Sequence, residues 1–306
     1  MCIRDSYIPE LMSVQLSGLR HLVLVDTKAP VSFFAYPGRN SYLVPEGCEV
    51  HELAAPDSDA LGSLESLVEA LGASGAAPGL QSPTPPDLPT GELSAEKVCQ
   101  AVGALLPEGA IVSDESQTSG VTLATSTAGA PRHDWLALTG GAIGQGLPVA
   151  VGAAVACPDR PVLALEADGS ALYTIQALWT MAREELNVTV VIFNNRSYAI
   201  LNMELARVGA QACGPEAKAQ LDLSRPDVDF VKLAAGFGVP ARRVQTAEEL
   251  VPALRESVAE PGPHLIEVVV PTMFTPRQLR AMPYALRALE KLPRPMAAAV
   301  KRRLYP

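Results

Sequence analysis

The stretch PVLALEADGSALYTIQALWTMAREELNVTVVIFNNRSY, residues 161–198, decides the fold. Residues 162–165 and 188–193 are short apolar runs, as expected of parallel strands that are buried on both faces. Between them, apolar residues recur at steps of three and four, which predicts an amphipathic helix that begins near Ser170. The stretch therefore predicts a strand, a helix and a second strand of an α/β sheet.

Two polar turns follow these strands, Asp168-Gly169-Ser170 and Asn194-Asn195. A helix of about sixteen residues spans roughly 24 Å, and a strand of about six residues returns roughly 20 Å in the opposite direction. In a right-handed crossover, both turns lie at the carboxyl edge of adjacent parallel strands, where open α/β sheets bind ligands. We therefore expect Asp168 and Asn195 to be neighbours in space.

The chemistry of these side chains suits a hard cation that carries a diphosphate. Mg²⁺ prefers six oxygen ligands and usually takes one or two carboxylates, with carbonyls, water and phosphate completing the set. Asp168 and Asn195 would supply two of these oxygens, and a helix amino terminus near Ser170 would stabilise the anion. Each pair is also a common turn former, so a purely structural role for either turn stays open.

The same motif, with Asp168 and Asn195 separated by 27 positions, resembles the metal and diphosphate motif of thiamine-diphosphate enzymes. Residues 139–154, TGGAIGQGLPVAVGAA, resemble the glycine-rich segment that precedes this motif in those enzymes. The chain looks most like the carboxyl-terminal portion of acetolactate synthase large subunits and benzoylformate decarboxylases. It departs from the family at Ala167, where glycine is usual, and the added methyl group lies where backbone and phosphate approach closely.

The resemblance implies two cofactors, thiamine diphosphate and Mg²⁺. Asp168, Asn195 and the backbone carbonyl of Ser197 would be the metal ligands. The cofactor contacts that the family makes fall here on Gln117, Thr118, Gly141, Ile143, Asp168, Gly169, Ser170, Asn195, Ser197 and Tyr198. Ile143 would be the bulky residue beneath the cofactor, although it could equally be a core residue. Residues 117–118 could also be a solvated strand-to-helix turn.

The activity implied by the resemblance is decarboxylation of a small 2-oxo acid, followed by protonation or by addition to a second carbonyl compound. In the family, a glutamate from a pyrimidine-binding domain, usually that of a partner subunit, activates the cofactor, which implies a homo-oligomer. Glu115 lies in the wrong domain for that role, so no catalytic acid or base is assigned. We expect the chain to bind its cofactors weakly and to be inactive alone.

Two other classes of function stay open. The run GGAIGQG could be a dinucleotide fingerprint of a nicotinamide oxidoreductase, with Glu166 as the acid that binds the ribose. Asn194-Asn195 has no role in such a site, which makes this interpretation the weaker one. A non-catalytic subunit is the second alternative, suggested by Ala167 and by the missing catalytic glutamate.

The fold class predicted is α/β, with a doubly wound parallel sheet that binds the diphosphate, preceded by part of a Rossmann-like central domain. The expected boundaries are a partial central domain at 1–72, a Pro/Gly-rich linker at 73–93, the diphosphate-binding domain at 94–272 and a basic tail at 273–306. Residues 1–6 look like a non-native leader.

The partial central domain should contain three strands and one helix. Residues 21–25, 31–35 and 49–54 are expected as strands, and Ser58 is expected to cap a helix with a single apolar face. In the next domain, Ser94 should cap the first helix, and a helix is expected over 246–259.

Composition excludes several partners. A formal net charge of −9 argues against nonspecific binding to nucleic acid or to an anionic membrane. The chain has no run of about 18 apolar residues. Its five scattered cysteines indicate reduced thiols and a cytoplasmic location. The four histidines, His21, His51, His133 and His264, are expected to be structural, and the basic tail to be solvated or to face a partner.

Overall fold

The computed structural model describes residues 5–36, 38–77, 79–80, 82–210, 214–272, 275–290, 292–293 and 296. The chain forms two compact units, one of residues 1–79 with 281–306 and one of residues 80–280. Among the described residues, no helix is both long enough and apolar enough to cross a lipid bilayer. Of the five cysteines, Cys2 and Cys213 lie outside the described residues, and the other three are free thiols.

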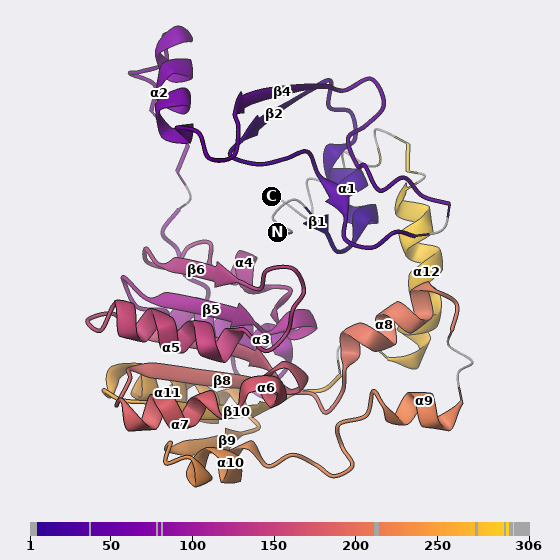
Figure 1. Ribbon diagram of the computed structural model, residues 1–306. Helices are drawn as coiled ribbons and strands as arrows, with labels where there is room; N and C mark the ends of the chain where they lie inside the picture. The colour runs from indigo at the N-terminus through magenta and orange to yellow at the C-terminus, as the bar shows by residue number, and fades with distance from the viewer. Residues whose placement is uncertain are drawn as a thin grey trace. The chain divides into compact units, whose positions relative to one another are not determined.

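The larger unit is built on a six-stranded sheet with the order β6-β5-β7-β8-β10-β9 (Figure 1). Every strand pair in it is parallel. The strands are β5 (Ile111–Glu115), β6 (Asp134–Ala137), β7 (Val162–Ala167), β8 (Val188–Asn194), β9 (Ala241–Val244) and β10 (His264–Val269). This sheet confirms the predicted α/β fold, and the chain reverses its direction of strand addition between β5 and β7.

Helices cover both faces of this sheet, which explains why its strands are apolar without alternation. Val162 and Ala164 belong to a core cluster with α5 (Gly146–Ala156), α7 (Ala177–Arg183) and α10 (Phe230–Gly236). Leu163 and Leu165 point to the opposite side, into a cluster with α3 (Ala95–Leu105) and α11 (Ala247–Ala259). The sheet is therefore doubly wound.

The expected cap of α3 and the helix expected over 246–259 are confirmed. The Ser94 hydroxyl accepts a hydrogen bond from the Lys97 N–H. Thr246 and Glu249 form a reciprocal capping box at the start of α11. The remaining segments of this unit are η1 (Gln117–Gly120), α4 (Leu123–Thr127), α6 (Asp168–Thr174), α8 (Ala199–Arg207) and α9 (Pro215–Ala219).

The prediction of a single helix after β7, beginning near Ser170, is wrong in two respects. The helix begins at Asp168 rather than near Ser170, and it is divided into α6 and α7. At the division, the N–H groups of Leu178 and Trp179 donate three residues back, to Ile175 and Gln176, instead of four. This three-residue spacing is that of a 3₁₀ turn, which apolar spacing alone does not reveal.

The smaller unit contains two short parallel strand pairs, β1 (Asp5–Ser6) with β3 (Val31–Ser32), and β2 (His21–Val25) with β4 (Glu49–Ala54). Its helices are α1 (Pro9–Leu16) and α2 (Ala60–Ala70). The strand expected at 31–35 is therefore only two residues long. Asp59, and not Ser58, caps α2, because the Asp59 carboxylate accepts from the Gly62 N–H.

The apolar face expected on α2 is exposed to solvent. Leu61, Leu64 and Leu71 have exposed fractions of 68%, 42% and 71%, and no residue of the helix is buried. Helix α12 (Pro276–Glu290) carries the first basic residues of the tail, and Arg277, Arg280 and Arg287 are exposed. The basic residues at 301–303 lie outside the described residues.

Residues 80–93, expected as the second part of a linker, belong to the larger compact unit. Leu93 is buried in its core, and a Cβ on Gly129 would lie 2.1 Å from the backbone carbonyl oxygen of Thr84. The domain boundaries given above stay predictions.

Candidate cofactor and metal site

The two polar turns predicted from the sequence meet at the carboxyl edge of β7 and β8. Ala167 is the register partner of Phe193, so Asp168 and Asn195 leave neighbouring strands at nearly the same level. The Asp168 Oδ2 accepts a hydrogen bond of 2.6 Å from the backbone N–H of Arg196. Its Oδ1 accepts one of 2.8 Å from the Gly169 N–H. The carboxylate of the first turn is therefore held by the backbone of the second.

Asn195 is buried and is fixed in the same way. Its Oδ1 accepts a hydrogen bond of 2.9 Å from the Ser197 N–H, and its Nδ2 lies 3.5 Å from the Ser119 hydroxyl. Arg196, between Asn195 and Ser197, has a φ of 59°, which is the left-handed conformation that closes this turn. The backbone carbonyl of Ser197, the third expected metal ligand, already accepts a hydrogen bond from the Ala199 N–H. A carbonyl oxygen has a second lone pair for a cation.

The link to Ser119 brings η1 to this edge of the sheet. Gln117 and Thr118 lie on η1, immediately before Ser119, and both are half-buried. Gln117 has a φ of 55°, so the backbone turns sharply at the end of β5. Residues expected to contact the cofactor are thus gathered from three strand ends, those of β5, β7 and β8.

The environment of Asp168 favours a bound cation. Its side chain is almost fully buried, and burial raises the pKa of the carboxyl to about 6, although the N–H groups of Gly169 and Arg196 oppose this effect. An ionised carboxylate in such a place is stabilised by a divalent cation. The donor set of carboxylate, amide oxygen and backbone carbonyl is the one that Mg²⁺ prefers. The residues present therefore fit this ion.

Gly169 lies against an aromatic ring that leaves no room for a side chain in the present arrangement. A Cβ at this position would lie 2.3 Å from Cε1 and 2.7 Å from Cδ1 of Tyr198. Tyr198 comes from the turn after β8, so its ring packs across the two turns. Ser170 follows Gly169 in α6 and is buried. The sequence-predicted residues Gly169, Ser170 and Tyr198 are therefore all close to Asp168.

Gly141 and Ile143 lie on a separate segment, the turn that leads from β6 to α5. Gly140 and Gly141 have φ values of 66° and 62°, and Ile143 is half-buried. The end of the turn is held by Glu115, whose Oε1 and Oε2 accept hydrogen bonds of 2.5 Å from the N–H groups of Gly144 and Gly146. The glycine turn is thus attached to the end of β5.

Sequence reasoning missed a pair of buried carboxyl groups at this attachment. Glu115 and Glu166 are register partners at the carboxyl ends of β5 and β7, where the direction of strand addition reverses. Burial raises the pKa of both, and that of Glu166 well above its usual range, with the Glu115 charge as a second cause. Glu115 holds two N–H donors, and the Glu166 oxygens have no hydrogen-bond partner of normal geometry among the described residues. Burial and the neighbouring Glu115 charge therefore favour the protonated form of Glu166.

The signal that could have revealed this pair is the presence of glutamate at the ends of two otherwise apolar strands. The sequence suggested for Glu166 only the role of a ribose-binding acid, and the structure instead places it at 0% exposure. A Cβ on Gly146 would lie 2.0 Å from the Glu166 Oε1. The two carboxyl groups and the glycine turn are therefore packed against one another.

Ala167, the departure from the family pattern, has an ordinary backbone. Its φ of −75° and ψ of 148° are those of an extended residue, which alanine adopts without strain. The glycine usual in the family is therefore not needed for the chain's conformation at this position.

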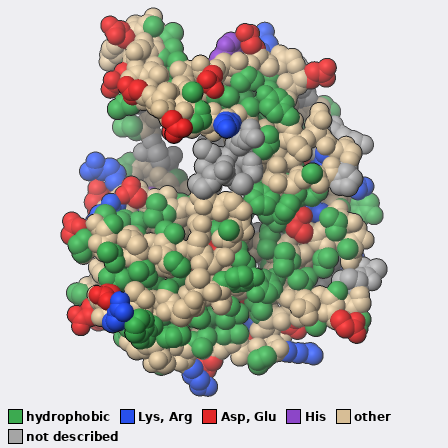
Figure 2. All heavy atoms as spheres, viewed as in Figure 1, with side chains coloured by type: hydrophobic (Ala, Val, Ile, Leu, Met, Phe, Trp, Pro, Cys, Tyr) green, Lys and Arg blue, Asp and Glu red, His purple; other side chains and the backbone are tan. Residues whose placement is uncertain are grey.

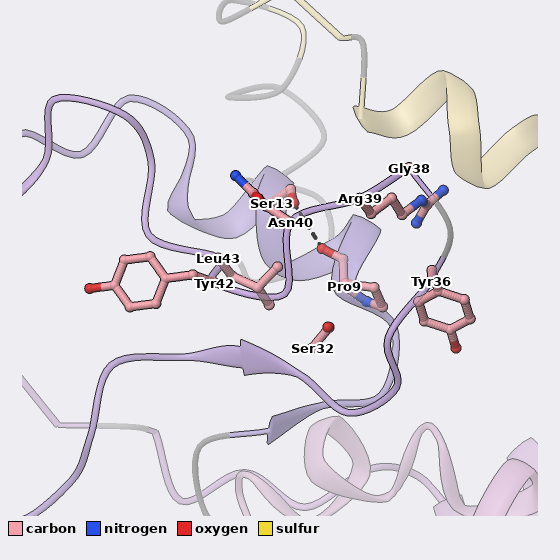
Figure 3. A pocket seen from close by; sticks show the side chains of 9 residues that line it. All are labelled: Pro9, Ser13, Ser32, Tyr36, Gly38, Arg39, Asn40, Tyr42 and Leu43. Atoms are coloured by element: carbon pink, nitrogen blue, oxygen red, sulfur yellow. Dashed lines mark hydrogen bonds between the residues drawn. The ribbon is translucent and has the colours of Figure 1, made fainter.

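The smaller unit contains a cavity of about 290 Å³, which Figure 3 shows between α1, β3 and the loop that follows β3. Ser13, Ser32, Tyr36 and Arg39 are among the residues that line it. The Ser13 hydroxyl donates to the Pro9 carbonyl, and the Arg39 guanidinium is paired with the buried Glu10. The Ser13 hydroxyl and the Arg39 guanidinium are thus engaged with the chain itself.

Comparison with known proteins identifies the site-bearing unit. Residues 117–268 match the family described as thiamine pyrophosphate enzyme, C-terminal TPP binding domain. The chain contains the C-terminal TPP binding domain of the thiamine pyrophosphate enzymes. The resemblance inferred from the Asp168 and Asn195 motif is confirmed, and the dinucleotide interpretation of the glycine turn is the less favoured one.

Among curated proteins, this chain is 59% identical over 277 residues to the "Putative acetolactate synthase large subunit IlvX" of Mycobacterium tuberculosis, covering 88% of this chain and 52% of the relative. It is 34% identical over 239 residues to benzoylformate decarboxylase of Pseudomonas aeruginosa, covering 76% of this chain and 44% of the relative. The chain therefore spans about half the length of the curated relatives it matches.

Solved structures agree with this assignment. The thiamine diphosphate-dependent 4-hydroxybenzoylformate decarboxylase of Rhodococcus jostii matches with a TM-score of 0.69 at 28% identity, over 85% of this chain and 50% of that one. Benzoylformate decarboxylase of Polynucleobacter necessarius matches with a TM-score of 0.67 at 26% identity, over 87% and 52%. The fold of the unit is that of thiamine-diphosphate-dependent enzymes.

Proposed function

We propose that this chain binds thiamine diphosphate through Mg²⁺ at the edge formed by β7 and β8. Asp168, Asn195 and the backbone carbonyl of Ser197 would hold the metal ion. The observation that carries the proposal is the contact between the two turns, in which the buried Asp168 carboxylate is held by the backbone of the turn that contains Asn195. The match to the C-terminal TPP binding domain supports the choice of cofactor.

The other expected contacts surround this metal site. Gly169, Ser170 and Tyr198 adjoin Asp168, whereas Gln117 and Thr118 adjoin Asn195 through Ser119. Gly141 and Ile143 would face the cofactor from the glycine turn, which Glu115 holds at the end of β5. Their assignment as cofactor-binding residues follows from the family motif.

When bound, thiamine diphosphate supplies a nucleophilic carbon and an electron sink for decarboxylation of 2-oxo acids. The residues of this chain would position it. Asp168 and Asn195 would anchor the diphosphate through the metal ion, and Glu115 would fix the glycine turn that carries Ile143. Burial of these groups excludes water and strengthens each electrostatic contact.

The activity of the whole protein is proposed as that of an acetolactate synthase-like 2-oxo-acid decarboxylase or carboligase, supported by the 59% identical relative. A lyase similar to benzoylformate decarboxylase is the alternative, supported by the solved structures. We expect it to act as a cytoplasmic homo-oligomer. The chain alone should not turn over substrate, because none of its described residues is assigned as catalytic acid or base.

Calorimetric titration of thiamine diphosphate into the chain, with and without Mg²⁺, tests the proposal. Wild type should bind in the presence of Mg²⁺, and Asp168→Ala should not. The exposed Asp159, in the turn before β7, offers a matched control, so Asp159→Ala should bind like wild type. Tryptophan fluorescence would verify that each variant is folded. Binding that is independent of Mg²⁺, or retained in Asp168→Ala, would overturn the proposed metal ligands.

A second variant distinguishes a non-catalytic subunit from an enzyme whose site is weakened by Ala167. If Ala167 weakens an active site, Ala167→Gly should tighten Mg²⁺-dependent binding, since it removes a methyl group near the diphosphate. Unchanged affinity would instead favour the non-catalytic subunit. Titration of NADH into the same sample distinguishes the nicotinamide alternative, which predicts saturable binding without Mg²⁺.

A further inference from the structure

The β2–β4 pair of the smaller unit gathers two histidines and a glutamate on one face. His21 on β2 is the register partner of Glu49 on β4. Side chains two residues apart on a strand point to the same face, so His51 lies beside Glu49 and near His21. The side chains of His21, Glu49 and His51 are 63%, 67% and 43% exposed. The side chains of both histidines are therefore accessible to solvent.

Three potential ligand atoms converge at this point. The Nδ1 of His21 lies 3.1 Å from the Nε2 of His51. The Oε2 of Glu49 lies 3.5 Å from the first nitrogen and 3.9 Å from the second. A point in the plane of these three atoms lies about 2.05 Å from each of them, so an ion displaced slightly out of this plane toward a fourth ligand has bonds within the usual range for zinc with histidine nitrogen and carboxylate oxygen.

A hydrogen bond between the two rings accounts for only one of the three distances. It does not explain why a single carboxylate oxygen approaches both nitrogens. A shared cation accounts for all three distances together. Two imidazoles and one carboxylate form a borderline donor set, which suits Zn²⁺ and Co²⁺ better than Mg²⁺ or Ca²⁺.

We infer that His21, Glu49 and His51 form a binding site for a divalent transition metal ion, Zn²⁺ in the first place, with water in the remaining position. Its three protein ligands come from two strands, so the ion connects β2 to β4. The exposure of all three side chains leaves space for the water ligand. The site lies in the smaller unit and is distinct from the proposed cofactor site, which is built from oxygen ligands of the larger unit.

The connection would matter because this strand pair has little apolar support. Of the described residues in β2 and β4, only Leu24 and Ala54 are buried, and Val23 is 54% exposed. A two-stranded pair is marginally stable by itself. A metal ion that binds the folded pair and not the unfolded chain stabilises the pair by mass action.

Zinc titration of the tag-free, metal-stripped chain tests the inference, with excess Mg²⁺ present to occupy the oxygen site around Asp168. We expect one zinc ion to bind per chain. His51→Ala and Glu49→Gln should each weaken the affinity about tenfold or more, since loss of even an outer-shell partner has effects of that size. Co²⁺ should give the visible absorption of a tetrahedral complex in wild type and lose it in both variants.

Two controls separate this site from other zinc ligands. Cys48→Ser removes the neighbouring thiol, and His133→Ala removes a histidine of the larger unit. Both should bind zinc like wild type. Hydrogen exchange gives an independent measurement, because zinc should slow exchange of the β2 and β4 amides in wild type and not in His51→Ala. Equal zinc affinity of wild type and His51→Ala, or unchanged exchange in β2 and β4, would overturn the inference.

Discussion

Replacement of Gly169 by alanine should destabilise the cofactor edge through a single neighbour, Tyr198. The new Cβ would lie 2.3 Å from the nearest ring carbon, closer than real Cβ contacts, so the ring or the start of α6 must move. Overpacking of this kind costs about 1–3 kcal/mol. Alanine gains up to about 1 kcal/mol over glycine in a helix. The free energy of unfolding should therefore fall by about 1 kcal/mol.

A double-mutant cycle with Tyr198→Ala isolates the cause. Once the ring is removed, Gly169→Ala should no longer destabilise the chain, and the helix propensity of alanine should raise stability by about 0.5 kcal/mol. The coupling energy between the two positions should then be between about 1 and 2 kcal/mol, as found for residues in direct contact. A change in α6 alone would give no coupling to Tyr198.

Urea unfolding followed by tryptophan fluorescence measures the four stabilities. Both tryptophans, Trp135 and Trp179, belong to the larger unit, so the signal reports on the unit that contains the site. A coupling energy below about 0.5 kcal/mol, the usual error of additivity, would refute the packing argument. So would equal destabilisation by Gly169→Ala in the presence and absence of the Tyr198 ring.

Three further predictions concern packing and titration in the same unit. Gly103→Ala should lower the free energy of unfolding by about 2 kcal/mol or more, because its Cβ would lie 2.0 Å from a backbone oxygen of α4. Gly152→Ala should raise it by about 0.5–1 kcal/mol, because the new methyl group in α5 would meet open space. Urea unfolding measures both changes. The raised pKa of Asp168 means that the metal-free folded chain binds more protons than the unfolded chain between about pH 4 and pH 6. The free energy of unfolding should therefore fall by up to about 3 kcal/mol as the pH rises from about 4 to about 6. Urea titrations at several pH values should show this fall in wild type and not in Asp168→Ala. Glu166→Gln should stabilise the chain at pH 8 and not at pH 4. Burial raises the pKa of Glu166, so the ionisation of this residue in the unfolded chain opposes folding only at pH values above its unfolded pKa. An equal effect at both pH values would contradict a protonated Glu166 in the folded chain.

The sequence by itself determined the sheet and the principal polar edge. The runs at 162–165 and 188–193 are apolar apart from Thr189, which is typical of strands in a sheet that helices cover on both faces. Because parallel strands end at the same edge, their polar ends at Asp168 and Asn195 had to be neighbours, and the structure joins them through the N–H of Arg196. Local patterns also predicted the cap at Ser94, since a cap depends on residues within one helical turn.

The tertiary structure decided the features that depend on strands far apart in the sequence. Glu115 and Glu166 become partners because β5 and β7 pair, and the glycine turn completes their surroundings. The division between α6 and α7 is a change of hydrogen-bond spacing, which the apolar stripe does not record. His21, Glu49 and His51 converge because β2 and β4 are parallel and in register. A periodic pattern fixes which face a side chain occupies, and only strand pairing determines which distant side chain lies beside it.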